Sequence, residues 1–305
     1  METHTALRGH IDWYPDLANL DKVVEGKTKM IFPIKGMPGI VEVVSKDHLT
    51  KNNDPTPTKM DGKGVLSTTT TANIFELFRL CGIPVAYIER HRPHSFVALH
   101  ADMVKLEVVG RVAADGSYRR RNPSKHEQYE RLPEPVIEFF LKTSGKKWGD
   151  IDLPDDDPLA LYRNNAFELY HPAKPLNEQM SISIRASDVF PSVLFFFMDS
   201  VMLKIREFAM RALLVLDRAF AAWGYTLCDV KFEFGFTRDG RLVLADVVDA
   251  DSMRVRCPDG IERSKQAFRN NVPLEEVKKG FEMIAQVSGF FSQPEVATRI
   301  IAELA

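Results

Sequence analysis

One stretch of the chain, residues 229–246, constrains the fold more than any other. Its sequence is DVKFEFGFTRDGRLVLAD. Charged and apolar side chains alternate strictly from Asp229 to Phe234, and this period of two predicts a strand with one apolar and one charged face. The Asp239-Gly240 pair that follows is a strong signal for a two-residue hairpin turn. We therefore expect residues 242–248 to return as the antiparallel partner strand.

The predicted pairing brings two acidic residues together. If the turn holds two residues, Glu233 lies directly opposite Asp246, and like charges in that position destabilise a hairpin. A divalent cation held by both carboxylates would remove the conflict, and Lys231 on the same face could contribute or hold a phosphate. An ordinary solvated face is the alternative. A loop longer by one residue would shift the pairing.

Length and charge narrow the class of protein. The chain has 305 residues and a formal net charge of −2. This length allows a large core and favours two domains. The balanced charge, without a basic stripe interleaved with aromatic residues, argues against a nucleic-acid partner. The short basic run at residues 119–121 is still sufficient to hold a phosphate.

Cysteine usage and hydropathy argue against secretion and against a membrane protein. Cys81, Cys228 and Cys257 stand alone, without the spacing of a zinc site or a disulfide framework, which fits a reducing cytoplasm. The N-terminal residues have no apolar signal-peptide core. The most apolar run, residues 189–205, is interrupted by two charged residues, so we expect a buried helix there and not a membrane span.

Periodicity and turn residues predict the other elements. Strands are expected at residues 22–33 (two, joined around Gly26), 40–45, 85–89, 96–99 and 104–112, and helices at 64–80, 193–223, 273–288 and 293–304. Loops are expected at residues 52–63, 142–188 and 259–271.

Three further motifs could bind anionic or polar ligands. In KVVEGKTK, residues 22–29, Lys27 and Lys29 stand two apart on a predicted strand, so both ammonium groups would lie on one face, as a polyphosphate requires. The segment lacks the spacing of a P-loop, and a solvated edge strand is the alternative. In EVVGRVAADGSYRRR, residues 107–121, a turn with a serine and arginines suits a phosphate or carboxylate. The acidic loop DADSMR, residues 249–254, could hold a polar ligand beside the proposed metal; plain turns are the alternative for both.

The order of these motifs is more informative than any one of them. EGKTK is followed by DGKGVLSTTTTANIFELFRLCGIPVAYIER, then by EVVGRVAADGSYRRRNP, and finally by DVKFEFG and LVLADVVDADSMR. Together they resemble the SAICAR synthetase (phosphoribosylaminoimidazole-succinocarboxamide synthase) family, over about residues 22–142 and from about residue 195 to the end. The resemblance implies an α+β, two-lobed fold with largely antiparallel sheets, related to the ATP-grasp and kinase-like nucleotide binders. It implies a nucleotide-binding lobe over residues 1–104 and a larger substrate- and metal-binding lobe over residues 105–305.

The resemblance also implies a reaction. Family members join L-aspartate to the carboxylate of carboxyaminoimidazole ribonucleotide in purine biosynthesis, and the products are SAICAR, ADP and phosphate. ATP activates the carboxylate as an acyl phosphate, and the aspartate amine then displaces phosphate. This chemistry uses ATP and Mg²⁺, with cations around the phosphates. The partners implied are small molecules, and the oligomeric state, including a homo-oligomer, stays open.

Matching positions carry the family's roles over to this chain. The resemblance assigns ATP binding to Lys27, Lys29, Met103 and Lys142, and Mg²⁺ binding to Glu233 and Asp246. It assigns substrate binding to Arg111, Ser117, Arg254, Lys265 and Arg269. Roles at the reacting centre fall to Asp229, Lys231 and Arg254. In this reading the two acidic residues of the hairpin face each other because a metal lies between them and ATP.

Departures from the family pattern keep other functions open. At residues 50–53 this chain has Thr-Lys-Asn-Asn, where the family has Ser/Thr-Ala-Gly-Asp/Asn. Ser264 replaces an aspartate of the family. The segment from about residue 143 to residue 188 is longer than expected. These changes affect loops that could set substrate choice. The alternative function is therefore a paralogous amide-forming ligase for a related carboxylated nucleotide or azole. A nucleotide-binding protein without catalysis is the third hypothesis. The retained residues Glu233, Asp246, Lys27 and Lys29 argue against it, since a binding protein has little need of an intact metal pair.

Overall fold

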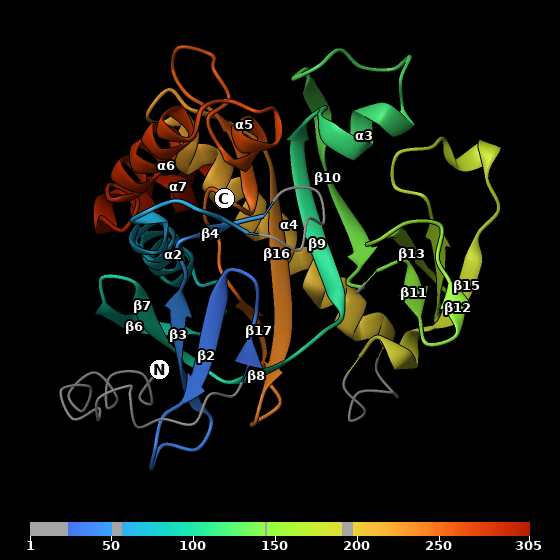
Figure 1. The fold of residues 1–305 in the computed structure, drawn as a ribbon, viewed down its shortest axis with the longest axis horizontal. Coiled ribbons are helices and arrows are strands. Elements are labelled where there is room, and N and C mark those ends of the chain that lie inside the picture. Colours follow the sequence, from blue (N-terminus) through green and yellow to red (C-terminus); the bar gives the residue numbers. More distant parts are fainter. Residues whose placement is uncertain (1–23, 51–56, 144, 191–197) are drawn as a thin grey trace.

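The computed structural model describes residues 24–50, 57–143, 145–190 and 198–305. They form an α+β fold whose sheets are largely antiparallel, as the sequence predicts. A five-stranded sheet lies beside a nine-stranded sheet, and most of the helices gather next to both (Figure 1).

The five-stranded sheet has the strand order β1-β2-β3-β7-β6. Its strands are β1 (Val24–Glu25), β2 (Lys29–Pro33), β3 (Ile40–Ser45), β6 (Tyr87–Arg92) and β7 (Ser95–Leu99). Helix α2 (Lys63–Leu80) packs on it through Phe75, whose ring centroid lies 5.9 Å from that of Tyr87 and 6.5 Å from that of Phe96. Aromatic pairs at such distances stabilise a core beyond the burial of their surface, and they fix the sheet on α2.

The nine-stranded sheet is built around β16 (Thr226–Thr237). Its main path is β15-β14-β13-β10-β9-β16-β17, and β8 and β18 also pair with β16. The other strands are β8 (Ala101–Met103), β9 (Leu106–Ala113), β10 (Arg131–Leu141), β13 (Leu159–Arg163), β14 (Ala166–Tyr170), β15 (Ile182–Arg185), β17 (Leu242–Ala245) and β18 (Met253–Arg256). Two short ladders, β4 (His48–Leu49) with β5 (Thr58–Lys59) and β11 (Lys147–Trp148) with β12 (Ile151–Asp152), stand apart from both sheets. Because β16 has partners on both sides, it is the central strand of the molecule.

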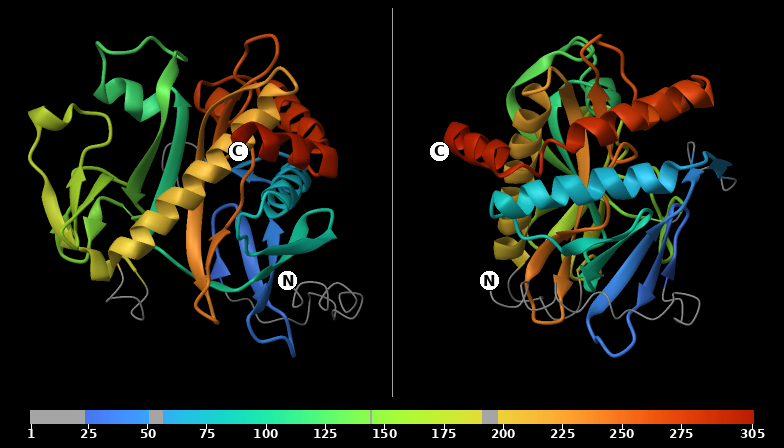
Figure 2. Two further views of the ribbon diagram at one scale, coloured as in Figure 1. Left: turned by 180° about the vertical axis from the view of Figure 1, so that it is seen from behind. Right: turned by 90° about the vertical axis from the view of Figure 1, so that its left-hand side faces the viewer.

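Helix α4 (Met198–Ala221) crosses the back of the nine-stranded sheet (Figure 2). It packs on β16, β9 and β10, and its side chains Ile205, Leu213 and Leu216 are fully buried. Helix α6 (Leu274–Ser288) packs on α2, and α7 (Pro294–Leu304) packs on α4. The shorter helices are α3 (Gly116–Arg121), η3 (Leu176–Glu178), η4 (Ala186–Asp188) and α5 (Lys265–Arg269).

The hairpin of β16 and β17 forms, but its pairing differs from the expected one by one residue. Glu233 pairs with Ala245, and the loop holds three residues, 238–240. Gly240 has φ of 78°, and a left-handed glycine closes a three-residue hairpin loop as well as a two-residue turn. The prediction that Glu233 lies directly opposite Asp246 was therefore wrong. Asp246 lies one residue beyond β17, with φ of 64°.

Four segments that we expected to be loops or turns contain regular structure. In the segment 52–63 it is limited to β5 and to Lys63 at the start of α2. Residues 142–188 include the paired strands β13 to β15, whose sequences are too short to reveal their alternation beside many turn residues. The segment 259–271 contains α5, which Ser264 caps by accepting a hydrogen bond from the backbone N–H of Gln266. Residues 116–117 begin helix α3 in place of a turn.

Most of the other predicted elements are confirmed. The strands expected at 40–45 and 96–99 and the helices expected at 64–80, 273–288 and 293–304 match β3, β7, α2, α6 and α7. The helix expected at 193–223 is confirmed over its described part; residues 193–197, like residues 22–23 and 51–53, lie outside the described residues. No helix in the described ranges is long and apolar enough to cross a membrane. The division of the chain into two lobes at residue 104 stays a prediction, because one cluster of buried side chains contains residues from both sides of this position.

Gly280 allows a test of the helix packing. A Cβ added at Gly280 would lie 2.1 Å from the backbone oxygen of Arg263. Alanine normally stabilises a helix by about 1 kcal/mol relative to glycine, but here α6 would have to move. We expect Gly280→Ala to lower the free energy of unfolding by about 2–3 kcal/mol in urea denaturation. Gln286→Ala on the exposed face of α6 is the control and should change it by less than about 0.5 kcal/mol. A Gly280→Ala variant as stable as the wild type would contradict the packing.

Candidate active site

Two cavities lie along the charged face of β16. The first has a volume of about 350 Å³ and is lined by residues of the five-stranded sheet and of the β16–β17 hairpin. Its apolar wall includes Ile31, Val41, Val43, Phe75 and Phe96, and its charged end holds Lys29, Lys142, Glu233 and Asp246. The second has a volume of about 330 Å³ and is lined mainly by polar residues of β9, β16, β18 and α5.

Lysine–carboxylate pairs hold the charged end of the first cavity. Lys29 pairs with Asp246, and Lys142 pairs with Glu233. The side chain of Glu233 is 2% exposed, and burial alone would raise its pKa. Lys231, Lys142 and Lys29 instead hold the pKa of Glu233 well below its usual range. Burial lowers the pKa of Lys29 to about 8.

Lys231 links the two cavities. Its Nζ lies 2.8 Å from Oε1 of Glu107 and 2.9 Å from Oε1 of Glu233. Burial opposes the charge of this ammonium group, but the two carboxylates raise the pKa of Lys231 above its ordinary value. Lys231 lines the second cavity, whereas Glu233 lines the first. The ammonium group therefore lies where ligands of the two cavities would meet.

The register of the sheet builds a cation cluster in the second cavity. Asp229 on β16 is the cross-strand partner of Arg111 on β9 and, on its other side, of Arg254 on β18. Its carboxylate accepts hydrogen bonds from both guanidinium groups, with 2.7 Å from Nη1 of Arg111 to Oδ2. Arg111 also donates to Oε2 of Glu138 at 2.6 Å and to Oγ of Ser117 at 3.2 Å. Guanidinium groups fixed beside a hydroxyl suit a phosphate or carboxylate ligand.

Helix α5 brings two more cations to this cavity. Lys265 and Arg269 are four residues apart, so they lie on one side of the helix. Burial lowers the pKa of each. Asp251 lies 2.5 Å from Nζ of Lys63, a side chain that is 2% exposed, and 3.8 Å from Nζ of Lys265. This end of the cavity can therefore take an acidic ligand.

Most of the predicted site residues line one of the two cavities. The first cavity is lined by Lys29, Met103, Lys142, Glu233 and Asp246. The second is lined by Arg111, Ser117, Asp229, Lys231, Arg254, Lys265 and Arg269. Lys27 does not, because β2 begins only at Lys29 and Lys27 lies exposed in the preceding bend. The burial of Asp229 and Glu233 excludes the solvated face that we considered for β16.

Sequence reasoning missed four residues of the site. Glu107 and Glu138 come from β9 and β10, and Lys63 begins α2. Their contacts depend on strand pairing and helix packing, which the sequence does not display. Asp157 lies in LPDDDP, where three consecutive aspartates were an available signal. It lines the second cavity, and burial together with Glu107 raises the pKa of Asp157 to about 6.

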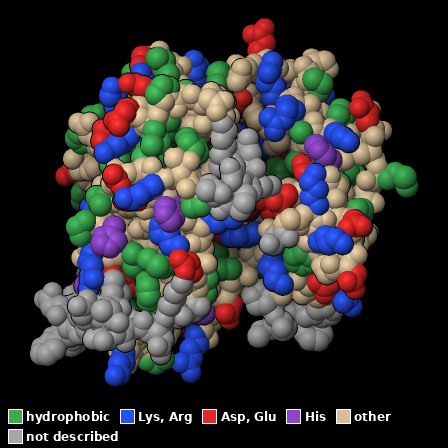
Figure 3. All heavy atoms as spheres, in the orientation of Figure 1, with side chains coloured by type: hydrophobic (Ala, Val, Ile, Leu, Met, Phe, Trp, Pro, Cys, Tyr) green, Lys and Arg blue, Asp and Glu red, His purple; other side chains and the backbone are tan. Residues whose placement is uncertain are grey.

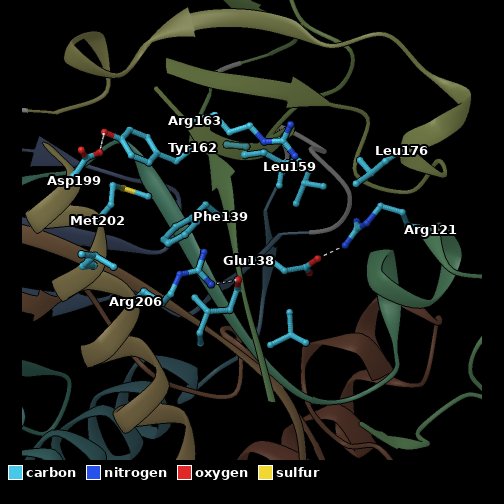
Figure 4. Close-up of a pocket in the computed structure, with 15 residues that line it drawn as sticks. Arg121, Glu138, Phe139, Leu159, Tyr162, Arg163, Leu176, Asp199, Met202 and Arg206 are labelled. Carbon is cyan, nitrogen blue, oxygen red and sulfur yellow. Dashed lines mark hydrogen bonds and ion pairs between the residues drawn. The ribbon is translucent and has the colours of Figure 1, made fainter. Parts of the chain in front are cut away.

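A third cavity, of about 570 Å³, lies beside β10 and the beginning of α4 (Figure 4). Much of its lining is apolar, including Phe139, Leu159 and Met202. Glu138 lies in its wall and joins Arg121 to Arg111. None of the predicted site residues lines this cavity. Glu138 therefore connects it to the cation cluster of the second cavity.

Acidic and basic side chains gather in a hollow near the middle of the face shown in Figure 3.

Within the described ranges, no group of three or more His, Cys, Asp and Glu side chains could hold a metal ion. Two carboxylates together with a phosphate ligand can nevertheless complete a Mg²⁺ site. Glu233 and Asp246, at the charged end of the first cavity, fit that donor set.

Comparisons with known proteins agree with this architecture. The sequence model of the family described as SAICAR synthetase matches residues 22–286. A phosphoribosylaminoimidazole-succinocarboxamide synthase of Roseiflexus sp. (strain RS-1) is 32% identical over 274 residues, which cover 87% of this chain and 95% of that protein. A solved structure described as SAICAR synthetase (Type-2) in complex with ADP has a TM-score of 0.67 and 24% identity, and covers 88% of this chain and 97% of that one. A phosphoribosylaminoimidazole-succinocarboxamide synthase from Ehrlichia chaffeensis also gives a TM-score of 0.67, at 21% identity over 88% of this chain and 98% of that one.

The raised pKa of Asp157 predicts how stability depends on pH. A carboxyl group whose pKa rises from 3.8 to about 6 on folding contributes stability below pH 4, and this contribution is lost as the pH rises through 6. Asp157→Asn retains the uncharged form at every pH. It should raise the free energy of unfolding at pH 8 by about 1–2 kcal/mol, after allowance for solvent screening, and leave it nearly unchanged at pH 4.

Urea denaturation at the two pH values measures this difference. Asp150→Asn, at an exposed position near the same loop, is the control and should show no such pH dependence. An equal gain for Asp157→Asn at pH 4 and pH 8 would show that its charge is not the cause.

Proposed function

The chain belongs to the SAICAR synthetase family, and from this premise we propose that it joins L-aspartate to the carboxylate of carboxyaminoimidazole ribonucleotide at the expense of ATP. The observation that carries the proposal is the meeting of two cavities at Lys231. One cavity suits a nucleoside triphosphate and the other an anionic substrate. A ligase that transfers a phosphoryl group between them requires this adjacency.

The first cavity would bind ATP. Its apolar wall suits the adenine ring, and Met103 on β8, which lines the cavity, would offer its backbone to the ring edge. Lys29 and Lys142 would hold the phosphates at the charged end. A solved SAICAR synthetase of the same fold is in complex with ADP, which supports the use of ATP by this chain.

Glu233 and Asp246 would hold Mg²⁺ when ATP is bound, and their lysine partners would then turn to the phosphates. The metal would supply charge stabilisation at the transferring phosphoryl group. The low pKa of Glu233 favours this role, because the carboxylate remains ionised throughout the neutral range.

The second cavity would bind the two remaining substrates. Arg111, Ser117 and Arg254 would hold the ribonucleotide, since fixed guanidinium groups and a hydroxyl match its anionic groups. Lys265 and Arg269 would hold the carboxylates of L-aspartate. Lys231 would stabilise the charge that develops as the ribonucleotide carboxylate takes the phosphoryl group and the aspartate amine then displaces phosphate.

A paralogous ligase with another substrate is the second candidate, and Ser264 weakens the case for it. Ser264 is fully buried and caps α5, a role that aspartate fills equally well. This substitution therefore preserves the helix that carries Lys265 and Arg269. A second departure, residues 50–53, includes Thr50, whose Oγ1 lies 3.2 Å from Nζ of Lys265. Residues 51–53 and the longer segment 143–188 remain the positions at which substrate choice could differ.

An ADP-release assay tests the proposed function. Mg-ATP, L-aspartate and carboxyaminoimidazole ribonucleotide are supplied together, and each is then left out in turn. We expect release that depends on all three. Release with another carboxylated azole nucleotide, but not with this one, would favour the paralogous ligase. ATP binding without turnover of any carboxylate would favour a binding protein.

Asp246→Asn tests the metal assignment. The variant removes a charged ligand but retains the shape of the side chain, and asparagine tolerates the left-handed backbone at this position. We expect ADP release to fall by about 10²–10³-fold with little change in melting temperature. Asp239→Asn in the exposed loop of the same hairpin is the control. Turnover at the wild-type rate in Asp246→Asn would overturn the assignment.

Glu138→Gln tests how Arg111 is held. The variant removes the charge that Arg111 and Arg121 share. Loss of a charge-assisted hydrogen bond should raise KM for the ribonucleotide by about tenfold, while KM for ATP stays unchanged. Steady-state kinetics with each substrate varied in turn measures both constants. Glu134→Gln, exposed on the same strand, is the control. Equal changes in the two KM values would indicate a general loss of structure.

A further inference from the structure

Asp157 reaches the second cavity from the segment of residues 143–188, which is longer than the family resemblance leads us to expect. It lies in the loop between β12 and β13. Its Oδ1 accepts a hydrogen bond from the backbone N–H of Thr143 at 2.8 Å, and its own N–H donates to Oγ1 of Thr143 at 3.0 Å. Thr143 directly follows Lys142, so the contact ties this loop to the wall of the ATP cavity. For Oδ2 the described part of the chain provides no hydrogen-bond partner.

The other carboxylates of this cavity are already engaged with cations. Glu107 pairs with Lys231, Asp251 pairs with Lys63, and Asp229 pairs with two arginines. Asp157 also lines the cavity but makes no ion pair with any described residue. A carboxylate held by a cation is a weak proton acceptor. Asp157 is therefore the carboxylate of the cavity that is best able to take a proton.

The charges around Asp157 adjust its affinity for a proton. Burial, Glu107 on β9 and Asp156 in the same loop raise its pKa, whereas the backbone N–H of Thr143 and the ammonium group of Lys231 lower it. The resulting pKa of about 6 lies close to the working pH of a cytoplasmic reaction. A base with such a pKa is largely ionised at neutral pH and still accepts a proton effectively.

We propose that Asp157 is the general base that accepts the amine proton of L-aspartate in the amide-forming step. The inference rests on the proposed function and assigns a group within the same site. Lys231 lies where the phosphoryl group would pass between the cavities, and Asp157 shares the cavity of Lys231. The amine that attacks the activated carboxylate would enter between them.

The step balances in atoms and charge. Oδ2 of Asp157 takes a proton from the ammonium group of L-aspartate. The lone pair that this frees forms the C–N bond with the acyl carbon, and the bond from that carbon to the phosphate oxygen breaks. Phosphate leaves with the electron pair of that bond. The second N–H proton becomes acidic once the C–N bond has formed and passes to the departing phosphate. Asp157 releases the proton that it took from the ammonium group to water.

Two nucleophiles separate this role from the earlier phosphoryl transfer. L-Aspartate requires removal of a proton as it attacks, whereas hydroxylamine is uncharged at neutral pH and attacks acyl phosphates without a base. We expect Asp157→Asn to reduce aspartate-dependent ADP release by about 10²–10⁴-fold. Release driven by hydroxylamine with Mg-ATP and the ribonucleotide should remain close to the wild-type rate.

Asparagine is a suitable replacement at this position. The backbone at Asp157 has φ of 49°, which asparagine adopts readily, and its side-chain oxygen can still accept from Thr143. Asp157→Glu, which retains a carboxylate, should restore part of the aspartate-dependent rate. The acidic limb of the wild-type kcat profile near pH 6 should be lost in Asp157→Asn. Asp155→Asn, in the same loop but outside the cavity lining, is the control.

The other outcomes would overturn the inference in distinguishable ways. Equal losses with both nucleophiles would assign Asp157 to substrate positioning, and an unchanged aspartate-dependent rate would remove it from the reaction. A wild-type protein that releases ADP with hydroxylamine but not with L-aspartate would contradict the amino-acid substrate of the proposed function, and the inference with it.

Discussion

Burial of charged side chains on one face of β16 is the constraint on which the rest of the structure depends. Asp229 and Glu233 are buried, and Lys231 between them is partly buried. Isolated charges at Asp229, Lys231 and Glu233 would each cost several kcal/mol. Each is therefore met by opposite charges from other elements: the first by two arginines, the second by Glu107, and the third by lysines. These partners come from β9, β18 and the end of β10, so the charges can be balanced only when the strands have assembled in one register.

The opposite face of β16 joins the hydrophobic core. The ring of Phe232 lies 6.1 Å from that of Phe78 on α2, and α4 covers the same sheet from behind. Because side chains alternate along a strand, the core and the candidate active site are built from neighbouring residues. Rigid packing on one face thus limits movement of the charged groups on the other, and preorganised charges are what electrostatic catalysis requires.

The sequence predicted the charged face of β16 because a period of two is a local property. The family resemblance located most of the Lys, Arg, Asp and Glu residues that line the two cavities. Loop length was harder to predict, since Asp239-Gly240 is compatible with two-residue and three-residue loops, and the choice between them moved Asp246 out of its expected pairing. Glu138 and Lys63 could not be found, because their partners are distant in sequence and meet them only after folding. The strands after Lys142 were missed because each is too short to show its period among turn residues.

Three charged side chains of the candidate site stand at alternate positions of one strand, so β16 fixes the distances between them. Successive side chains on one face are about 6.6 Å apart. The spacing between the carboxylate of Asp229, the ammonium group of Lys231 and the carboxylate of Glu233 is therefore set by backbone geometry and not by side-chain adjustment. One residue inserted or deleted within this stretch would turn every following side chain to the opposite face. Members of such a lineage can therefore vary loop lengths and loop sequences to change what they bind, while the length of this strand segment between its anchors has to stay constant.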